Sequence, residues 1–120
     1  MKIERFEDIQ SWQEARKLTN EVYKVTRRGE FSRDYGLRDQ IRRASVSVMS
    51  NIAEGFGRNS PKDFAHFLGI ANASCLEVQS HLYVALDLEY INDETFEHLY
   101  DLCSKTSRLI GGFIHYLKSR

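Results

Sequence analysis

A single proline, Pro61, occurs in the 120 residues, so long helices can form almost anywhere along the chain. With only seven glycines in addition, the sequence has few places for tight turns. Hydrophobic residues make up 42% and charged residues 28%, which is the balance of an ordinary water-soluble protein. The chain is therefore predicted to fold as one domain, residues 1–120, built from a few long elements.

Apolar residues recur at spacings of three and four in four stretches, the pattern of one buried face of an α-helix. The clearest stretch runs from Phe64 to Ala85 and keeps this alternation for three heptads. The others lie at about residues 11–28, 36–58 and 93–117, and no stretch alternates like a β-strand. The pattern predicts an all-α protein, an up-down-up-down antiparallel four-helix bundle.

Capping residues indicate where the later helices begin. Ser60 precedes Pro61 and Asp63, which is the expected chemistry for the start of the third helix. That helix should end near residue 88, and Asn92 or Asp93 should cap the fourth.

The ends of the first helix are less clearly marked. A capping box of Ser11 and Glu14 is one predicted start, and Asp8 is the alternative cap. Gly29 is expected just past its end. The glycine pair at 111–112 lies inside the fourth helix, where it predicts close backbone packing or fraying.

The connection between the first two helices is rich in aromatic residues and arginines. Phe31 and Tyr35 are expected to dock this connection on the bundle. Ser32 or Asp34 is expected to start a short turn before the second helix.

The stretch Gly36–Arg58 has more apolar surface than a single buried face requires. Two adjoining sets of apolar residues form an arc of about 200° at helical spacing. The helix is therefore predicted to pack on its own bundle with one flank and on a different partner with the other. The first set is Leu37, Ile41, Ala44, Val48 and Ile52; the second is Val46, Met49, Ala53 and Phe56; the opposite side holds Arg43, Ser47, Ser50 and Glu54.

The formal net charge is zero, but the charges are unevenly distributed. Residues 1–60 carry 12 Lys or Arg and 9 Asp or Glu, whereas residues 61–120 carry 5 and 8. No Lys or Arg occurs between Asp63 and Asp101. Binding to nucleic acid through overall charge is therefore not predicted, although a local basic patch is compatible with the pattern.

Four arginines of the second helix and its end, Arg38, Arg42, Arg43 and Arg58, are the candidate binding residues. In the first interpretation they form salt bridges to neighbouring helices on a solvated surface, the more common outcome for clustered charges. In the second they form a strip that binds phosphate groups or a partner through the planar guanidinium. Both interpretations stay open on the residues alone.

The sequence offers no constellation typical of catalysis, and we predict that the protein is not an enzyme and holds no metal or cofactor. The spacings Asp63-x-x-His66 and Glu77-x-x-x-His81 are not repeated as a di-iron bundle requires, and all four histidines are expected at exposed or edge positions. Cys75 and Cys103 lie on apolar stripes, which predicts buried free thiols. The segment 55–57 lacks the Lys-Ser/Thr of a phosphate-binding loop.

No signal peptide and no apolar run of about 18 residues is present in the sequence. A cytoplasmic protein without a membrane partner is therefore expected.

Several segments together resemble a known family, the four-helix-bundle proteins encoded in intervening sequences of bacterial 23S ribosomal RNA. These proteins are similar to the accessory variability determinants of diversity-generating retroelements. The resemblance spans nearly the whole chain. It rests on Trp12-x-x-Ala15 with Val22-Tyr23, on Tyr35-Gly36-Leu37-x-x-Gln40-Ile41-Arg42-Arg43-Ala44, on Ser50-Asn51-Ile52-Ala53-Glu54-Gly55, and on Phe67-Leu68-x-Ile70-Ala71.

The resemblance implies a bundle that assembles into a ring-like homopentamer. It also implies binding to RNA or DNA, or to a nucleic-acid enzyme such as a reverse transcriptase, with basic residues carried over at Arg42, Arg43 and Arg58. Subunit contact then accounts for the second apolar flank. The alternative is a protein-interaction scaffold without a nucleic-acid role, in which the arginines form structural or inter-subunit salt bridges.

Overall fold

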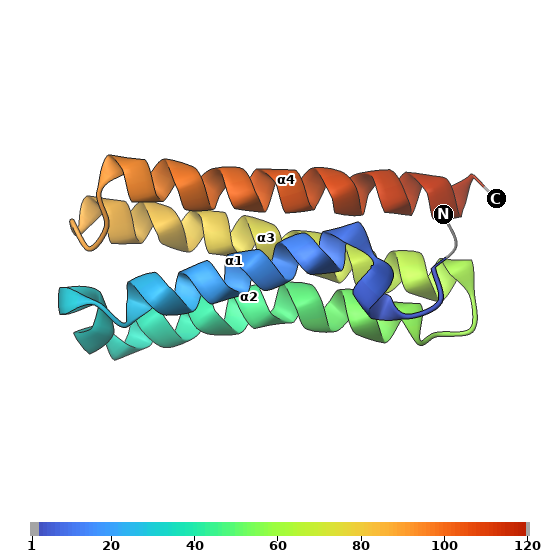
Figure 1. Cartoon of the computed structure of the whole chain (residues 1–120), viewed down its shortest axis with the longest axis horizontal. Coiled ribbons are helices and arrows are strands. Elements are labelled where there is room, and N and C mark those ends of the chain that lie inside the picture. The colour runs from blue at the N-terminus through green and yellow to red at the C-terminus, as the bar shows by residue number, and fades with distance from the viewer. Residues whose placement is uncertain (1–2, 120) are drawn as a thin grey trace.

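The computed structural model describes residues 3–119 and contains four long helices that lie side by side. Successive helices run in opposite directions (Figure 1), each packs on the next, and α1 also packs on α4. No strand occurs within residues 3–119, so the prediction of an all-α four-helix bundle is confirmed. The elements are η1 (Phe6–Asp8), α1 (Gln10–Thr26), η2 (Gly29–Arg33), α2 (Tyr35–Phe56), α3 (Pro61–Asp87) and α4 (Asp93–Lys118), where η marks a short 3-10 helix.

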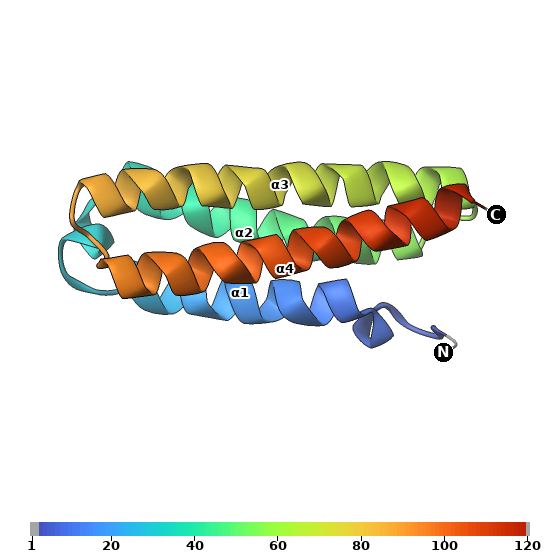
Figure 2. The ribbon, with the colours of Figure 1, turned by 90° about the horizontal axis from the view of Figure 1, so that it is seen from above.

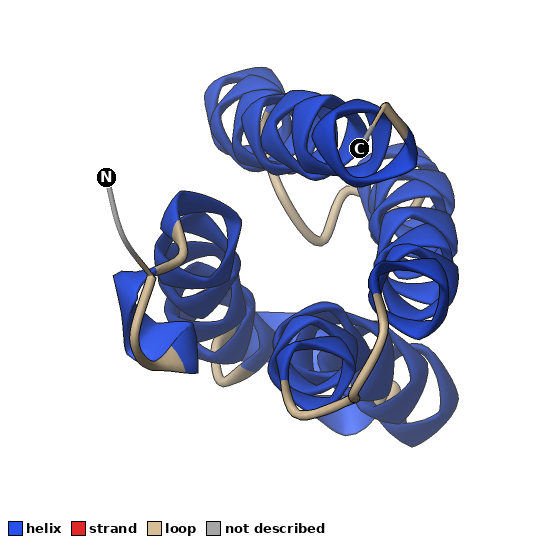
Figure 3. Ribbon diagram, turned by 90° about the vertical axis from the view of Figure 1, so that its right-hand side faces the viewer, coloured by secondary structure: helices blue, strands red, loops and turns tan. Residues whose placement is uncertain are grey.

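The bundle is elongated, with principal extents of 46 × 21 × 19 Å, and its two ends differ. The η2 end holds η2 and the turn between α3 and α4 (Figure 2). The α2–α3 end holds the turn 57–60 and the last turns of α4, and Figure 3 looks onto it. Residues 1–60, which include α1 and α2, carry more basic than acidic residues, and residues 61–120, which include α3 and α4, carry more acidic than basic residues. The bundle therefore has a basic side and an acidic side.

Side-chain caps start three of the four long helices. Ser60 accepts a hydrogen bond from the Asp63 amide (3.1 Å) and Asn92 accepts one from the Thr95 amide (2.8 Å), which confirms both predicted starts. At α2, Asp34 is the cap. Its carboxylate also accepts a hydrogen bond from the Tyr90 hydroxyl (2.9 Å), which ties the α3–α4 turn to the start of α2.

The predicted capping box at the start of α1 is wrong. The helix begins at Gln10 after an extended Ile9, and Ser11 lies inside its first turn, with no hydrogen-bond partner for its buried hydroxyl among residues 3–119. Asp8 instead caps η1, where it accepts from backbone amides. Ile9 is only 1% exposed, so burial of this apolar side chain determines the start of the helix in place of a polar cap.

Glu14, the other member of that predicted box, is turned inward and ties α1 to α4. Its carboxylate contacts the ammonium groups of Lys17 (3.0 Å) and, on α4, Lys105 (3.4 Å). Burial raises the pKa of Glu14, but the two lysines together outweigh burial and hold this pKa below its ordinary value.

The end of α1 also differs slightly from the prediction. The helix ends at Thr26, and Gly29 follows two residues after the Arg27 cap. Gly29 has a φ of 51°, a left-handed conformation that suits glycine. There it opens η2, which turns the chain so that Phe31 is buried.

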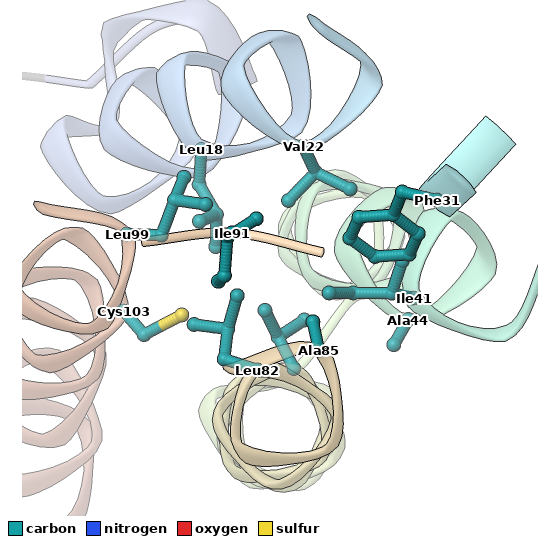
Figure 4. Close-up of a cluster of buried hydrophobic side chains, with 11 residues drawn as sticks. Leu18, Val22, Phe31, Ile41, Ala44, Leu82, Ala85, Ile91, Leu99 and Cys103 are labelled. Carbon is teal, nitrogen blue, oxygen red and sulfur yellow. The ribbon is translucent and has the colours of Figure 1, made fainter. Parts of the chain in front are cut away.

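The core consists of two clusters of buried side chains. The η2-end cluster draws on all four helices, on Phe31 from η2 and on Ile91 from the α3–α4 turn (Figure 4). The cluster at the α2–α3 end centres on Val48, Ile52, Leu68 and Ile110. The predicted stripe of α3 is confirmed. Its fully buried members are Leu68, Ala71, Cys75, Val78, Leu82 and Ala85.

The two cysteines are free and buried, as predicted. Burial raises the pKa of Cys75 to about 12, and burial likewise raises the pKa of Cys103. Both thiols are therefore protonated at neutral pH.

The glycines of α2 and α4 have opposite surroundings. At Gly55 on α2, an added Cβ would lie 2.8 Å from the Cβ of Phe67 on α3, so the two backbones approach closely there. Around Gly111 and Gly112 nothing lies within 4 Å of an added Cβ, and α4 continues through both. The expectation of close packing or fraying at 111–112 is therefore wrong, because both residues lie on the exposed face.

Candidate functional site

Two arginines on the N-terminal half of α2 stack on exposed tyrosines. The guanidinium of Arg42 lies 4.6 Å from the ring centre of Tyr23, and that of Arg38 lies 4.7 Å from the ring centre of Tyr35. Arg38 and Arg42 are four residues apart and hence share a side of the helix. Tyr23 is 37% exposed and Tyr35 is 64% exposed. We name these four residues the arginine–tyrosine cluster.

Hydrogen bonds fix both guanidinium groups but leave donors free. Arg42 donates from Nε to the Thr26 hydroxyl on α1 (2.8 Å). Arg38 donates from Nε to Asp39 (3.0 Å) and from Nη1 to the Ser32 carbonyl (3.0 Å). Within residues 3–119, both terminal nitrogens of Arg42 and Nη2 of Arg38 have no acceptor. Oriented guanidinium donors of this kind suit the oxygen atoms of a phosphate or carboxylate.

The other two candidate arginines lie elsewhere. Arg43 is exposed, and its side chain has no hydrogen bond or ion pair in the described part of the chain, but it points about 100° away from Arg42 around α2. Arg58 follows the end of α2, about 22–30 Å from the others at 1.5 Å per residue. There it pairs with Glu54 (3.0 Å) and lies 4.6 Å from the Phe67 ring centre. The four arginines therefore do not form one continuous strip.

Salt bridges from these arginines to neighbouring helices are also not observed among residues 3–119. Arg38 pairs with Asp39 and Arg58 with Glu54, both within the same segment of chain. Exposed pairs of this kind contribute little stability, about 0–1 kcal/mol.

The second apolar flank of α2 is largely used within the chain itself. Met49 and Phe56 are partly buried and pack on the cluster at the α2–α3 end. The arc is wide because α2 lies between two neighbours, α1 and α3. Ser47, expected on the opposite exposed side, in fact forms a hydrogen bond with Ser74 of α3 (2.9 Å). Val46 is 38% exposed and is the large apolar residue that the flank leaves open to solvent.

A larger exposed apolar surface lies on α3, and the sequence analysis missed it. Its large residues lie within an arc of about 140° that faces away from the core. Between Ile70 and Val84, Glu77 is the charged residue of this arc, and Lys62 and Asp87 lie in the same arc nearer the two ends of α3. The missed signal was the apolar residues outside the buried stripe, combined with the absence of Lys and Arg from 64 to 100. We name this surface the α3 face; its exposed members are Ile70, Leu76, Tyr83 and Val84.

No group of three or more His, Cys, Asp or Glu within residues 3–119 is placed to hold a metal ion. No described helix combines the length and the apolar composition needed to cross a membrane.

Comparison with known proteins identifies the family. The chain is similar to a solved protein of unknown function from the S23 ribosomal protein family of Bacteroides thetaiotaomicron VPI-5482. The two share 22% sequence identity and a TM-score of 0.79 over 87% of this chain and 97% of the other, so the likeness establishes the fold. A comparison with curated proteins found no match. The family described as 23S rRNA-intervening sequence protein matches residues 7–112. This match covers most of the chain, which therefore belongs to the 23S rRNA-intervening sequence protein family.

Proposed function

We propose that the protein is a non-enzymatic scaffold that assembles with copies of itself and binds nucleic acid through the arginine–tyrosine cluster. The observation that carries the proposal is the pair of arginines held on exposed tyrosines with free terminal donors. Guanidinium groups bind phosphates, and exposed aromatic rings stack on unpaired bases. The cluster combines both contacts along one side of α2, with Tyr23 contributed by α1.

RNA is the nucleic acid to test first, because the family description names 23S rRNA. DNA and a nucleic-acid enzyme such as a reverse transcriptase are the other partners that the resemblance implies. The two unpaired thiols support a cytoplasmic location, since reducing compartments keep cysteines free.

The arginine–tyrosine cluster is tested by RNA affinity measured over a range of salt concentrations. We expect Arg42→Ala to weaken binding of single-stranded RNA about tenfold, since it removes a charged hydrogen bond to phosphate. The slope of log affinity against log salt should fall by about 1. Arg42→Lys keeps the charge but loses the planar fork, and we expect it to restore the slope without the full affinity.

Arg108→Ala is the matched control. Arg108, like Arg42, is a helical arginine without an ion pair in the described residues; it is exposed and lies on α4. Its loss should leave RNA affinity within about twofold. Equal RNA affinity and salt slope for wild type and Arg42→Ala would show that the cluster does not bind RNA. If Arg42→Ala instead breaks the assembly, the scaffold without a nucleic-acid role is favoured.

Self-assembly is supported by the α3 face and by the division of charge. The α3 face is apolar and lies on the acidic side of the bundle, whereas Val46 and Arg43 lie exposed on α2 of the basic side. A head-to-tail contact between these unlike surfaces buries apolar area and pairs opposite charges. Such contacts close into rings when the rotation allows. The expected assembly is the homopentamer that the resemblance implies, with Val46 in the contact and Met49, Ala53 and Phe56 on the same flank of α2.

The assembly is tested by light scattering coupled to size-exclusion chromatography. We expect wild type to elute as an oligomer at micromolar concentration. Leu76→Glu on the α3 face and Val46→Glu on α2 should each yield monomer, because each places a charge in an apolar contact. Gln40→Glu adds the same charge at an exposed position of α2 and should leave the oligomer intact. A monomeric wild type, or an unchanged Leu76→Glu oligomer, contradicts the proposed contact.

A further inference from the structure

The α2–α3 end of the bundle contains a pocket of about 630 Å³ that none of the features above requires. Its volume is within the range of about 300–1,000 Å³ that is typical of small-molecule sites. The walls come from the end of α2, the start of α3, the last turns of α4 and Ile3. Figure 3 looks onto this end. The polar lining residues of the pocket are Arg58, Asn59 and Ser60.

Aromatic rings form most of the apolar wall. Four of the seven apolar lining residues are aromatic. The ring of Phe64 packs edge-on against Phe56 (6.2 Å between centres) and Phe113 (4.9 Å), and Phe113 packs in the same way on Tyr116 (6.2 Å). These contacts hold the rings in place, so a flat aromatic ligand meets preformed ring faces and edges. An aliphatic chain is expected to bind this wall less tightly than a planar aromatic ring does.

A second pocket of about 500 Å³ adjoins the first, and the two share Pro61 and Leu117. Lys62, His66 and Lys118 line this second pocket. Neither lysine has an ion pair within residues 3–119. Among the described residues, no carboxylate lines either pocket, although the chain has as many acidic as basic residues. The pair of pockets therefore complements a ligand with an aromatic body and an anionic group.

We propose that these two pockets together bind one nucleoside monophosphate unit, with the base among the aromatic rings and the phosphate on Lys62 and Lys118. Arg58 lines the base pocket and is already held by Glu54 and Phe67, so it is placed to donate to the edge of a base or to the ribose. The unit can be a free mononucleotide or the phosphorylated end of an RNA strand, since both present the same chemistry.

This site is separate from the arginine–tyrosine cluster. Arg38 and Arg42 lie in the N-terminal half of α2, about 20–30 Å along the helix from the turn that forms the pocket. Loss of binding at one site should leave the other unchanged, so failure of this proposal and failure of the proposed function are distinguishable.

The test is calorimetric titration of the full chain with adenosine 5′-monophosphate. We expect saturable binding, with adenosine and inorganic phosphate each weaker by about tenfold or more, because each lacks one half of the contacts. The double variant Lys62→Ala/Lys118→Ala should weaken binding of the nucleotide by about tenfold. Tyr116→Ala, at a residue that is 54% exposed and hence compatible with folding, should weaken it by a similar factor.

Arg108→Ala, at an exposed arginine of α4 that lines neither pocket, is the matched control and should bind the nucleotide like wild type. A 5′-phosphorylated RNA that displaces the nucleotide, where its 5′-hydroxyl counterpart does not, supports the RNA end as the source. Failure of the RNA to compete with bound nucleotide supports the free mononucleotide. Three results would overturn the proposal. They are no saturation below about 1 mM nucleotide, tighter binding of octanoate (an anion with an aliphatic chain) than of the nucleotide, and a nucleotide affinity unchanged in both the lysine and the tyrosine variants.

Discussion

Replacing Phe31 by alanine is expected to lower the free energy of unfolding by about 3–5 kcal/mol, the largest loss among the variants considered. Phe31 lies in the short η2 segment between two long helices, yet it is fully buried. Its ring stacks on Tyr90 with 5.3 Å between centres and an angle of 30°, and it packs with Val22 and Ile41 in the η2-end cluster (Figure 4). Its removal leaves a cavity where parts of the chain distant in sequence meet.

Urea denaturation followed by circular dichroism measures this loss. The matched control is Tyr35→Ala, at an aromatic residue that opens α2 just after this connection and is 64% exposed. We expect its effect on the free energy of unfolding to stay within about 0.5 kcal/mol. Equal effects for the two variants would mean that the η2 segment does not contribute to the core.

The substitution Gly55→Ala is expected to lower the free energy of unfolding by about 1–3 kcal/mol, although alanine is the better helix former. The new methyl group would meet the Cβ of Phe67 at 2.8 Å and Cδ1 of Phe64 at 2.9 Å. The Phe64 carbonyl oxygen, at 3.3 Å, belongs to the backbone of α3 and cannot move away from the methyl group unless the helix moves. Helices α2 and α3 must therefore separate to accept the methyl group.

Gly111→Ala provides a control with the opposite sign. Nothing lies within 4 Å of an added Cβ at this position of α4, so the gain in helix propensity should raise the free energy of unfolding by up to about 1 kcal/mol. Thermal unfolding of both variants should move the midpoint in opposite directions. A stabilising Gly55→Ala would show that the contact between the two helices is looser than described.

Regular features of the chain were predictable because local chemistry determines them. Ser60 and Asn92 cap α3 and α4 as their positions indicate, and the stripe of α3 is buried where its spacing places it. The start of α1 was not predictable from Ser11, because burial of Ile9 outweighs a side-chain cap. Local patterns therefore predict helices and their faces, while tertiary packing determines which of two plausible starts is used.

In the candidate site, too, the sequence indicates which residues matter, but tertiary packing determines what they contact. The arginines of α2 were identifiable from the sequence, but their partners were not, since Arg42 stacks on a tyrosine 19 positions earlier in the chain. The width of the apolar arc of α2 was read as surplus surface, although contact with two neighbouring helices accounts for Met49 and Phe56. The α3 face was missed for the same reason, because spacing alone does not show which apolar residues of α3 its neighbours α2 and α4 leave exposed.

The two buried cysteines have a practical consequence for following how this bundle opens. Cys103 belongs to the η2-end cluster and Cys75 to the cluster at the other end. A thiol reagent reaches either sulfur only when the surrounding helices part, since both are fully buried and protonated. The rate at which each cysteine is modified therefore reports the opening of its own half of the molecule. Equal rates of thiol modification at the two cysteines indicate that the bundle opens as a single cooperative unit. Different rates indicate that one end opens before the other.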